Sequence, residues 1–396
     1  MKVQPVAPWP HYDEDETEAV ARVLRSGKVN YWTGDECRQF EREYAEAAGC
    51  AHAVAVMNGT VALELALHAL EIPIGSDVIT TPRTFIASAS CIVAHGCTPV
   101  LADVDPDSGN ITAESIAQVI TPRTKAIIAV HLAGWPCDMD PIMALAEKHG
   151  LKVIEDCAQA NGATYKGRPV GCLGHAAAFS FCQDKIITTG GEGGMFTTND
   201  ENAWRRAWEY KDHGKSWDAV YNRQHAPGFR WLHESFGTNW RMTEMQAAIG
   251  RVQLRKLPEW TRIRRENMNG LFDALADLDV LRIPRAPEHI GHAAYKAYVY
   301  IRPERLKPGW SRDRIMVGFE AEGIPALSGS CSEIYKEKSF SSLSGVTYPE
   351  LPGAAFLGEN SLMFLVHPGQ GVSIDGYIKG LRGVLMSASS GSRECT

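Results

Sequence analysis

The chain has 396 residues, which exceeds the usual size of a single hydrophobic core, so we expect a large domain and a smaller one. Its 44% hydrophobic and 22% charged residues are typical of a soluble globular protein. Forty basic against 47 acidic side chains give a formal net charge of −7, which offers no general attraction for nucleic acid or an anionic membrane.

Cysteine usage and the start of the chain bear on the compartment. Ten cysteines are scattered without a C-x-x-C pair, which favours reduced thiols over a disulfide framework. The opening "MKVQPVAPWPHYDEDE" lacks the apolar core of a signal peptide, and no uncharged apolar run reaches the roughly 18 residues of a membrane span. We therefore expect a cytoplasmic protein with neither a membrane nor a nucleic-acid partner.

From about residue 50 to 200, short apolar runs alternate with helical segments such as "TVALELALHALEI", in which apolar residues recur every four positions. Such alternation predicts an α/β fold with a mostly parallel sheet covered by helices on both faces. Ligands of such sheets bind at the carboxyl ends of the strands. The predicted strands are "HAVAVM", "DVITTP", "TPVLADVD", "AIIAVH", "LKVIED" and "AAAFSF".

The second half of the chain changes in pattern. A helical stretch at 242–257 is followed by "PEWTRIRRENMNGLFDAL", which we interpret as a long helix leading out of the large domain. Mixed strand and helix patterns follow. We predict a large domain at 1–257, a small α+β domain at 258–386 and a disordered tail at 387–396, where the residues are small and polar.

"MNGT" follows the first predicted strand and opens a helix, so Gly59 and Thr60 place free backbone N–H groups at a helix N-terminus. Those donors and the helix dipole can hold a phosphate. The same residues also fit an ordinary N-cap with a turn glycine.

"VIEDCAQA" ends a predicted strand with Glu155 and Asp156. Acids at strand ends are commonly solvated or capping groups. A carboxylate under a pyridine ring would instead keep the ring nitrogen protonated, as pyridoxal phosphate chemistry needs.

Lys185 lies in "FSFCQDKIITTGGEGGM", between a predicted strand that carries Ser180 and a loop with four glycines. A lone loop lysine is ordinarily a surface charge, and the glycines could form a simple turn. A buried lysine loses its proton readily and forms Schiff bases with aldehydes, and glycines allow the backbone to approach a flat cofactor. The order of phosphate cradle, carboxylate and lysine is that of a pyridoxal-phosphate site.

The chain resembles the DegT/DnrJ/EryC1/StrS family of nucleotide-sugar aminotransferases, whose architecture is fold-type I, like that of aspartate aminotransferase. The similarity runs over nearly the whole chain. It rests on "LRSGKVNYWTGDECRQFEREYAEAAG", "TPRTKAIIAVHLAG", "VIEDCAQANGATYKGRPVG", "GTNWRMTEMQAAIG" and "FLVHPGQ". The chain departs from common family patterns in "CQDK" before the glycine loop and in a loop lengthened to "TTGGEGG".

The resemblance implies a role for each matching residue. Lys185 would carry the cofactor and act as general base and acid, and Asp156 would hold the ring proton. The other implied cofactor contacts are the phosphate ligands Gly59, Thr60 and Ser180, the ring-stacking Phe85, Gln159 near the phenolic oxygen, and Asn239 reaching the phosphate of a neighbouring subunit.

That last match implies a homodimer with shared active sites. The family further implies pyridoxal 5′-phosphate as cofactor, L-glutamate as donor and a nucleotide-linked keto-deoxysugar as acceptor, for glycan, lipopolysaccharide or antibiotic sugars. We favour a C4 ketone of a UDP-, GDP- or dTDP-linked 6-deoxyhexose, with C3 as the second choice, and predict no metal site. Plausible pocket residues are Tyr31, Trp32, Thr33 and His213.

Three alternatives to this hypothesis remain open. A sugar dehydratase on the same fold typically carries histidine in place of the Schiff-base lysine, so Lys185 argues against it. A non-catalytic pyridoxal-phosphate regulator would not need the lysine and the carboxylate. A Rossmann dehydrogenase would need a G-x-G-x-x-G after the first strand, which the chain lacks.

Overall fold

The computed structural model describes residues 8–224, 230–343, 347–369 and 374–391, and the side chains of 374–376 are not described. Its largest element is a seven-stranded sheet in the order β1-β9-β8-β5-β4-β2-β3. Five strands from β3 to β8 pair in parallel, and β9 alone runs against its two neighbours. The strands are β1 (His52–Val56), β2 (Asp77–Thr80), β3 (Thr98–Leu101), β4 (Thr124–Val130), β5 (Lys152–Asp156), β8 (Ala176–Ser180) and β9 (Gly194–Thr198).

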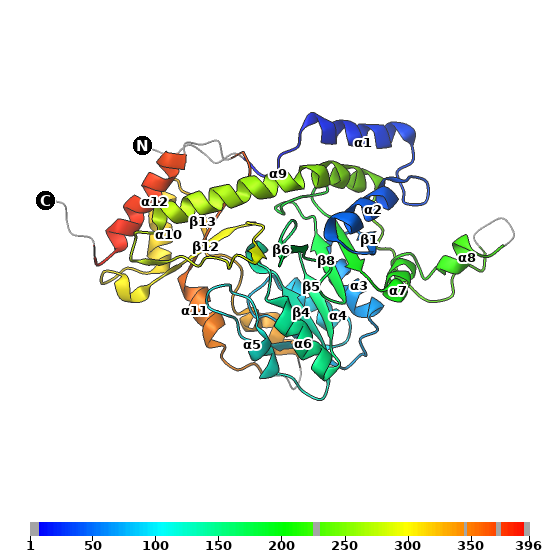
Figure 1. Ribbon diagram of the computed structural model, residues 1–396, viewed down its shortest axis with the longest axis horizontal. Helices are drawn as coiled ribbons and strands as arrows, with labels where there is room; N and C mark the ends of the chain where they lie inside the picture. The colour runs from blue at the N-terminus through cyan, green and yellow to red at the C-terminus, as the bar shows by residue number, and fades with distance from the viewer. Residues whose placement is uncertain (1–7, 225–229, 344–346, 370–373, 392–396) are drawn as a thin grey trace.

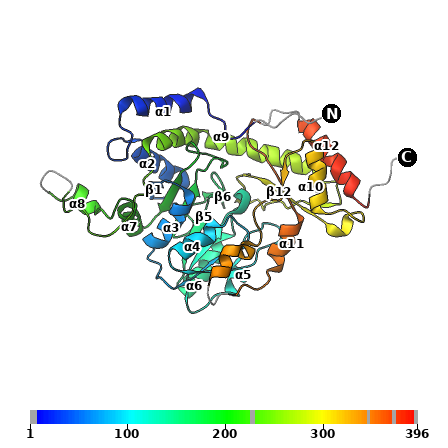
Figure 2. The same ribbon diagram turned by 180° about the vertical axis from the view of Figure 1, so that it is seen from behind.

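Both faces of this sheet are buried, because alternate residues of each strand pack on opposite sides. On one face Val54 and Ile154 pack with residues of α3 and α7, and on the other Ala55 and Val153 pack with residues of α2 and α6. Figure 1 shows α6 in front of the sheet, and Figure 2 brings α3 and α4 forward. The helices of this part are α1 (Glu14–Ser26), α2 (Glu36–Ala48), α3 (Gly59–Ala69), α4 (Ala87–Ala94), α5 (Ala113–Ala117), α6 (Met139–His149), α7 (Glu201–Lys211) and α8 (Trp217–Tyr221).

The second sheet is antiparallel and has the order β10-β12-β14-β13. It shares a separate apolar core with the last turns of α9, which contribute Leu271 and Leu275. Its elements are β10 (Leu281–Arg282), β12 (Ala297–Ile301), α10 (Arg312–Ala321), β13 (Ala326–Leu327), α11 (Pro352–Asn360), β14 (Ser361–Phe364) and α12 (Ile374–Ala388). A small third sheet joins β11 (Ile290–Gly291), β6 (Thr164–Tyr165) and β7 (Arg168–Pro169).

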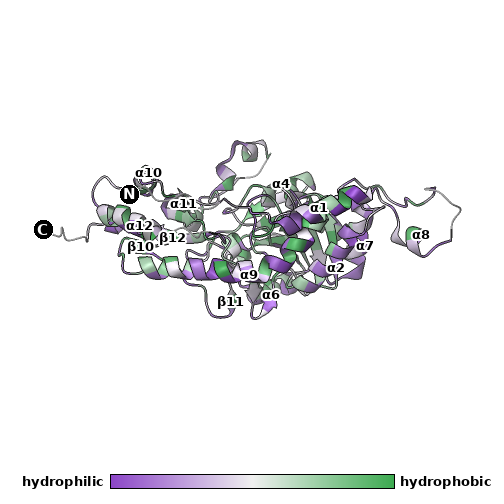
Figure 3. Cartoon of the chain, turned by 90° about the horizontal axis from the view of Figure 1, so that it is seen from above, coloured by the Kyte–Doolittle hydropathy of each residue, from purple (hydrophilic) through white to green (hydrophobic). Residues whose placement is uncertain are grey.

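The long helix α9 (Glu244–Leu275) connects the two parts and runs across the upper part of the molecule in Figure 1, beneath α1. Hydrophilic and hydrophobic residues alternate along it in Figure 3, as expected of a helix with one face packed on the protein. The predicted domain boundary at 257/258 falls inside this helix, which continues through Pro258.

The α/β fold, its mostly parallel sheet and the smaller C-terminal α+β part are as the sequence predicts. At the chain end, where we predicted a disordered tail from 387, α12 extends to Ala388 and the N–H of Ser390 donates to the carbonyl of Arg305 at 2.8 Å. Residues 392–396 lie outside the described part of the chain. Within that part, no helix combines the length and apolar character needed to cross a membrane.

Candidate active site

The strands that precede the candidate residues end at one edge of the large sheet. Gly194, the first residue of β9, pairs with both Val56 and Ser180, the last residues of β1 and β8. Asp156 ends the neighbouring strand β5 and pairs with Ala178. The parallel sheet therefore gathers at its carboxyl edge segments that are far apart in sequence.

The start of α3 and the end of β8 touch at this edge. A Cβ atom added to Gly59 would lie 2.7 Å from the Cβ of Ser180, so only glycine allows this approach. The side chain of Asn58 caps α3 by accepting from the N–H of Val61 at 3.0 Å. The N–H groups of Gly59 and Thr60, in the half-buried first turn, have no acceptor among the described residues.

Asp156 is buried at the end of β5, with 4% of its surface exposed. Its Oδ2 accepts from the Ser88 hydroxyl at 2.7 Å, and its Oδ1 accepts from the N–H of Ala158 at 3.1 Å. Burial raises the pKa of Asp156, although those two hydrogen bonds and the charge of Lys185 oppose the shift. The carboxylate keeps unused acceptor capacity toward a further donor.

Glu155, the preceding residue, is committed to a structural role. Its oxygens accept from the N–H groups of Gly171, Leu173 and Gly174 at 2.8–3.0 Å and from Nε2 of His131 at 3.0 Å. Burial opposes its ionisation, but the bond and charge of His131 and the backbone donors lower its pKa overall. The charge of Lys185 is one of the main influences on the pKa of Asp156. It is not among the main influences on the pKa of Glu155.

Lys185 follows β8 in a turn and is largely buried, with 17% of its side chain exposed. Its Nζ lies 3.5 Å from the Tyr295 hydroxyl and 3.7 Å from Oδ1 of Asp184. The Tyr295 hydroxyl donates to the other oxygen of Asp184. Burial opposes ionisation of Asp184, but Lys185 and Tyr295 outweigh it and lower its pKa. The lysine thus sits in a polar cluster, not on the open surface.

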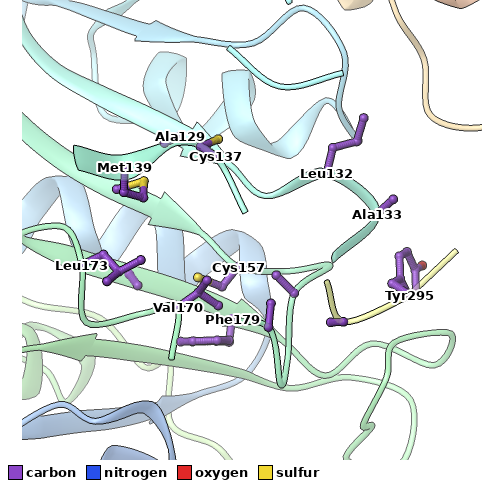
Figure 4. Packing of buried hydrophobic residues seen from close by; sticks show 14 of the residues in the cluster. Ala129, Leu132, Ala133, Cys137, Met139, Cys157, Val170, Leu173, Phe179 and Tyr295 are labelled. Atoms are coloured by element: carbon purple, nitrogen blue, oxygen red, sulfur yellow. The ribbon is translucent and has the colours of Figure 1, made fainter. Parts of the chain in front are cut away.

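Tyr295 comes from the segment before β12 and reaches the site from the small sheet. Its N–H donates to the carbonyl of Ala133 at 3.0 Å, and Figure 4 shows its side chain across from the Leu132–Ala133 turn that follows β4. The same turn binds Gln159, whose Oε1 accepts from the N–H of Ala133 at 2.8 Å. No acceptor for the Gln159 amide nitrogen occurs among the described residues.

Phe85 and Asn239 lie at the border of the site. Phe85 is 69% exposed and lies two residues before α4, whose Ser88 binds Asp156. Asn239 is exposed, and its neighbour Trp240 accepts from the N–H of Met57 at 3.0 Å. The sequence indicated no strand leading this segment to the sheet edge. The structure nevertheless pairs Val56 with Arg241, which brings the segment to the end of β1 within one chain.

The suggested pocket residues are mostly engaged elsewhere. Tyr31 is buried and accepts from Trp208 Nε1 at 3.0 Å, beside a separate cavity of 540 Å³. Trp32 donates from Nε1 to Asp212 at 2.8 Å. Thr33 donates to the carbonyl of Asn30, and His213 is exposed beside Asp212. Within the described part of the chain, the Lys185 ammonium contacts Tyr295 and Asp184, and none of these four residues.

Sequence reasoning missed Tyr295, Ser88 and the pairing of Lys185 with Asp184. Asp184 was visible as a departure from the family pattern in "CQDK". Ser88 and Tyr295 carry no sequence signal, because they reach the site through α4 and through the small sheet.

The residues at this edge fit pyridoxal phosphate. Free N–H groups at the start of α3, with Ser180 beside them, suit a phosphate group. The buried carboxylate of Asp156 suits a ring nitrogen that carries a proton, and Lys185 suits attachment of an aldehyde.

Comparison with known proteins supports this fit. Residues 10–369 match the model of the DegT/DnrJ/EryC1/StrS aminotransferase family. The chain is 45% identical over 317 residues to GDP-perosamine synthase of Caulobacter vibrioides, covering 80% of this chain and 81% of that protein. It is 40% identical over 296 residues to a UDP-N-acetyl-3-dehydro-alpha-D-glucosamine 3-aminotransferase of Acidithiobacillus ferrooxidans, covering 75% and 74%.

Among solved structures, the chain is similar to an aminotransferase from Psychrobacter cryohalolentis. The two share 57% identity and superpose with a TM-score of 0.94, over 97% of this chain and 100% of that one.

Proposed function

The chain belongs to the DegT/DnrJ/EryC1/StrS aminotransferase family, and we propose that it moves an amino group from L-glutamate to a nucleotide-linked keto-deoxysugar. The observation that carries the proposal is the placement of Lys185 and buried Asp156 at one sheet edge, beside the free N–H groups of α3. Pyridoxal 5′-phosphate, when bound, supplies an electron sink for the carbon that loses its proton.

The side chains of the chain have separable tasks in this reaction. Lys185 holds and moves the proton through its Nζ, because it is largely buried yet within reach of two polar partners. Asp184 and Tyr295 orient that Nζ and provide a charge that balances it. Asp156, as a carboxylate, would accept the proton carried by the ring nitrogen of the bound cofactor, and the hydrogen bond from Ser88 holds the carboxylate in position.

The acceptor that we favour is a 4-keto-6-deoxyhexose linked to GDP, UDP or dTDP. The likeness to GDP-perosamine synthase supports a nucleotide-linked sugar, and the likeness to a 3-aminotransferase of a 3-dehydro sugar keeps C3 as the second candidate. A dehydratase is disfavoured, because dehydratase relatives typically carry histidine where this chain has Lys185.

Borohydride reduction of the loaded protein tests the cofactor site. Mass spectrometry should find the pyridoxyl group on Lys185, and Lys185→Ala should lose turnover. Lys148→Ala, on the exposed end of α6, is the matched control and should keep it. Label on another lysine would refute the assignment. A panel of nucleotide keto sugars, each tested with L-glutamate, then identifies the acceptor.

We further propose that two chains form a homodimer with shared sites. Asn239 belongs to a segment that also exposes Trp231 and Phe236, with 90% and 99% of their surfaces accessible. This segment follows α8, which projects from the body of the molecule in Figures 1 and 2. Large apolar side chains exposed together favour contact with another protein surface. A second copy of the chain would cover Trp231 and Phe236. Asn239 of each chain would then reach the phosphate of the cofactor bound by the other chain.

A further inference from the structure

A cavity of 1030 Å³ opens beside Lys185, on the side of Asp184. Three parts of the chain enclose it: the N-terminal segment with Trp9, the turn before Lys185, and the small α+β part with Lys296 and His367. Its wall on the small-sheet side combines apolar residues such as Ile324 with the carboxylates of Asp313 and Glu320 on α10. The cavity is large enough for a small organic substrate next to the reactive lysine.

Arg264, on α9, is buried behind this cavity with 2% of its surface exposed. Its Nη1 donates to the carbonyl of Tyr295 at 3.4 Å. Nε and Nη2 have no acceptor among the described residues. The guanidinium lies 4.7 Å from the ring centre of Trp9, a residue of the cavity wall. Buried arginine donors are normally paired, so two unpaired nitrogens indicate a missing anion.

Lys296 lines the cavity and has 13% of its side chain exposed. Its Nζ lies 3.9 Å from Oδ2 of Asp184, whose other oxygen is near Lys185. Burial lowers the pKa of Lys296 to about 8 and that of Arg264 to about 9, and Arg264 adds to the shift of Lys296.

The charges around Lys296 do not balance. Arg264 and Lys185 are its neighbouring cations, and Asp184 is its neighbouring carboxylate. The two other carboxylates of the cavity wall, Asp313 and Glu320, are exposed on α10, where Asp313 pairs with Arg312 at 2.6 Å. His367, also in the wall, has its pKa lowered by burial and by the two neighbouring cations, Arg264 and Lys296, so it is neutral at neutral pH. A bound monoanion would reduce the excess positive charge.

We propose that Arg264 and Lys296 form the binding site for a carboxylate of the amino donor, an inference that rests on the proposed transamination. A guanidinium with two free N–H donors matches the two oxygens of a carboxylate, and an ammonium adds a third charged donor. The donor nitrogen must come to Lys185, and Lys296 shares Asp184 with that lysine. The competing ligand is the diphosphate of the nucleotide sugar. Its larger negative charge would be repelled more strongly by the carboxylate of Asp184, which lines the same cavity.

Glutarate is a suitable probe, because it has the two carboxylates of glutamate but no amine to react. Titration calorimetry on the cofactor-loaded protein should show about ten- to a hundredfold weaker glutarate binding for Arg264→Gln and for Lys296→Gln, the range expected for a lost charge-assisted hydrogen bond. Arg264→Lys keeps the positive charge but not the planar pair of N–H donors. Its affinity for glutarate should therefore lie between those of the wild type and Arg264→Gln. Arg262→Gln is the matched control: Arg262 is exposed on the same helix and pairs with Glu259 and Glu266.

Titration with GDP distinguishes the two anions. The inference requires GDP binding to stay within about twofold of wild type in the Arg264 and Lys296 variants. Unchanged glutarate binding, or weakened GDP binding with glutarate unaffected, would overturn it. In each variant, the label on Lys185 after borohydride reduction shows whether the cofactor site is intact, so failure of the transaminase proposal is seen separately.

Thermal unfolding without donor separates a binding role from a structural one. If the role of Arg264 is to bind an anion, its charge is buried and only partly paired in the donor-free protein. Arg264→Gln then removes that charge and should leave the melting temperature unchanged or higher. A clear fall in melting temperature would assign Arg264 to the scaffold. In that case glutarate binding by Lys296→Gln, whose side chain lines the open cavity, decides the proposal.

Discussion

Replacing Asp156 with Asn should slow the reaction without destabilising the fold. The change keeps the shape of the side chain but removes its charge at a position with 4% exposure. Ser88 now donates to Asp156 at 2.7 Å and lies 2.9 Å from the Thr84 hydroxyl. In the variant the amide nitrogen can donate to Ser88, and Ser88 can donate to Thr84. The hydrogen bonds to Ser88 therefore reverse without being lost, which limits the effect of the change on stability.

The loss in rate follows from electrostatics. A preorganised charged group in a buried site commonly contributes about 3 to 4 kcal/mol to transition-state stabilisation, or two to three decades in rate. Stopped-flow spectroscopy of the L-glutamate half-reaction, at saturating cofactor, measures this loss. A rate within about threefold of wild type would refute the role of Asp156.

The stability of the cofactor-free protein tests the same reasoning independently. Burial raises the pKa of Asp156, so its ionisation in the folded state is penalised. The stability contribution of such a group is present below the ordinary aspartate pKa of about 3.9 and is lost as pH rises through the raised value. Asp156→Asn should therefore gain stability relative to wild type as pH rises above about 3.9, as measured by urea unfolding. A loss that grows with pH would mean that the carboxylate is stabilised when ionised.

Three other changes test separate parts of the site. Gly59→Ala places a Cβ 2.7 Å from that of Ser180, so cofactor retention in dialysis should fall at least about tenfold, even though alanine favours the helix by about 1 kcal/mol. Unchanged retention would exclude this contact from the phosphate site. Glu155→Gln leaves at least one backbone N–H unpaired and should reduce the free energy of unfolding by about 1 to 3 kcal/mol, whereas a fully stable variant with slow transamination would contradict its structural role. Mixing inactive Lys185→Ala and Asn239→Ala chains should restore about a quarter of wild-type activity if Asn239 serves the partner chain, and no recovery after proven exchange would assign it to its own chain or to neither.

The sequence by itself determined the fold class and the family. Alternating apolar runs such as "AIIAVH" and "LKVIED" can only be buried as strands of a helix-covered parallel sheet, and they became β4 and β5. Their order along the chain also placed Asp156 and Ser180 at strand ends, because the carboxyl ends of parallel strands meet at one edge. These are local patterns whose meaning does not depend on distant residues.

Only the tertiary structure decided which of the two neighbouring acids anchors a loop and which residues surround the lysine. Glu155 and Asp156 are adjacent in sequence, but successive side chains of a strand point to opposite faces. Glu155 therefore anchors a loop, whereas Asp156 accepts from Ser88 and its pKa responds to the charge of Lys185. Tyr295 and Arg264 reach the neighbourhood of Lys185 only because α9 and the small sheet pack across the end of the large one. The contacts of Tyr295 with Lys185 and Asp184 join residues 110 and 111 positions apart, and no local pattern records such contacts.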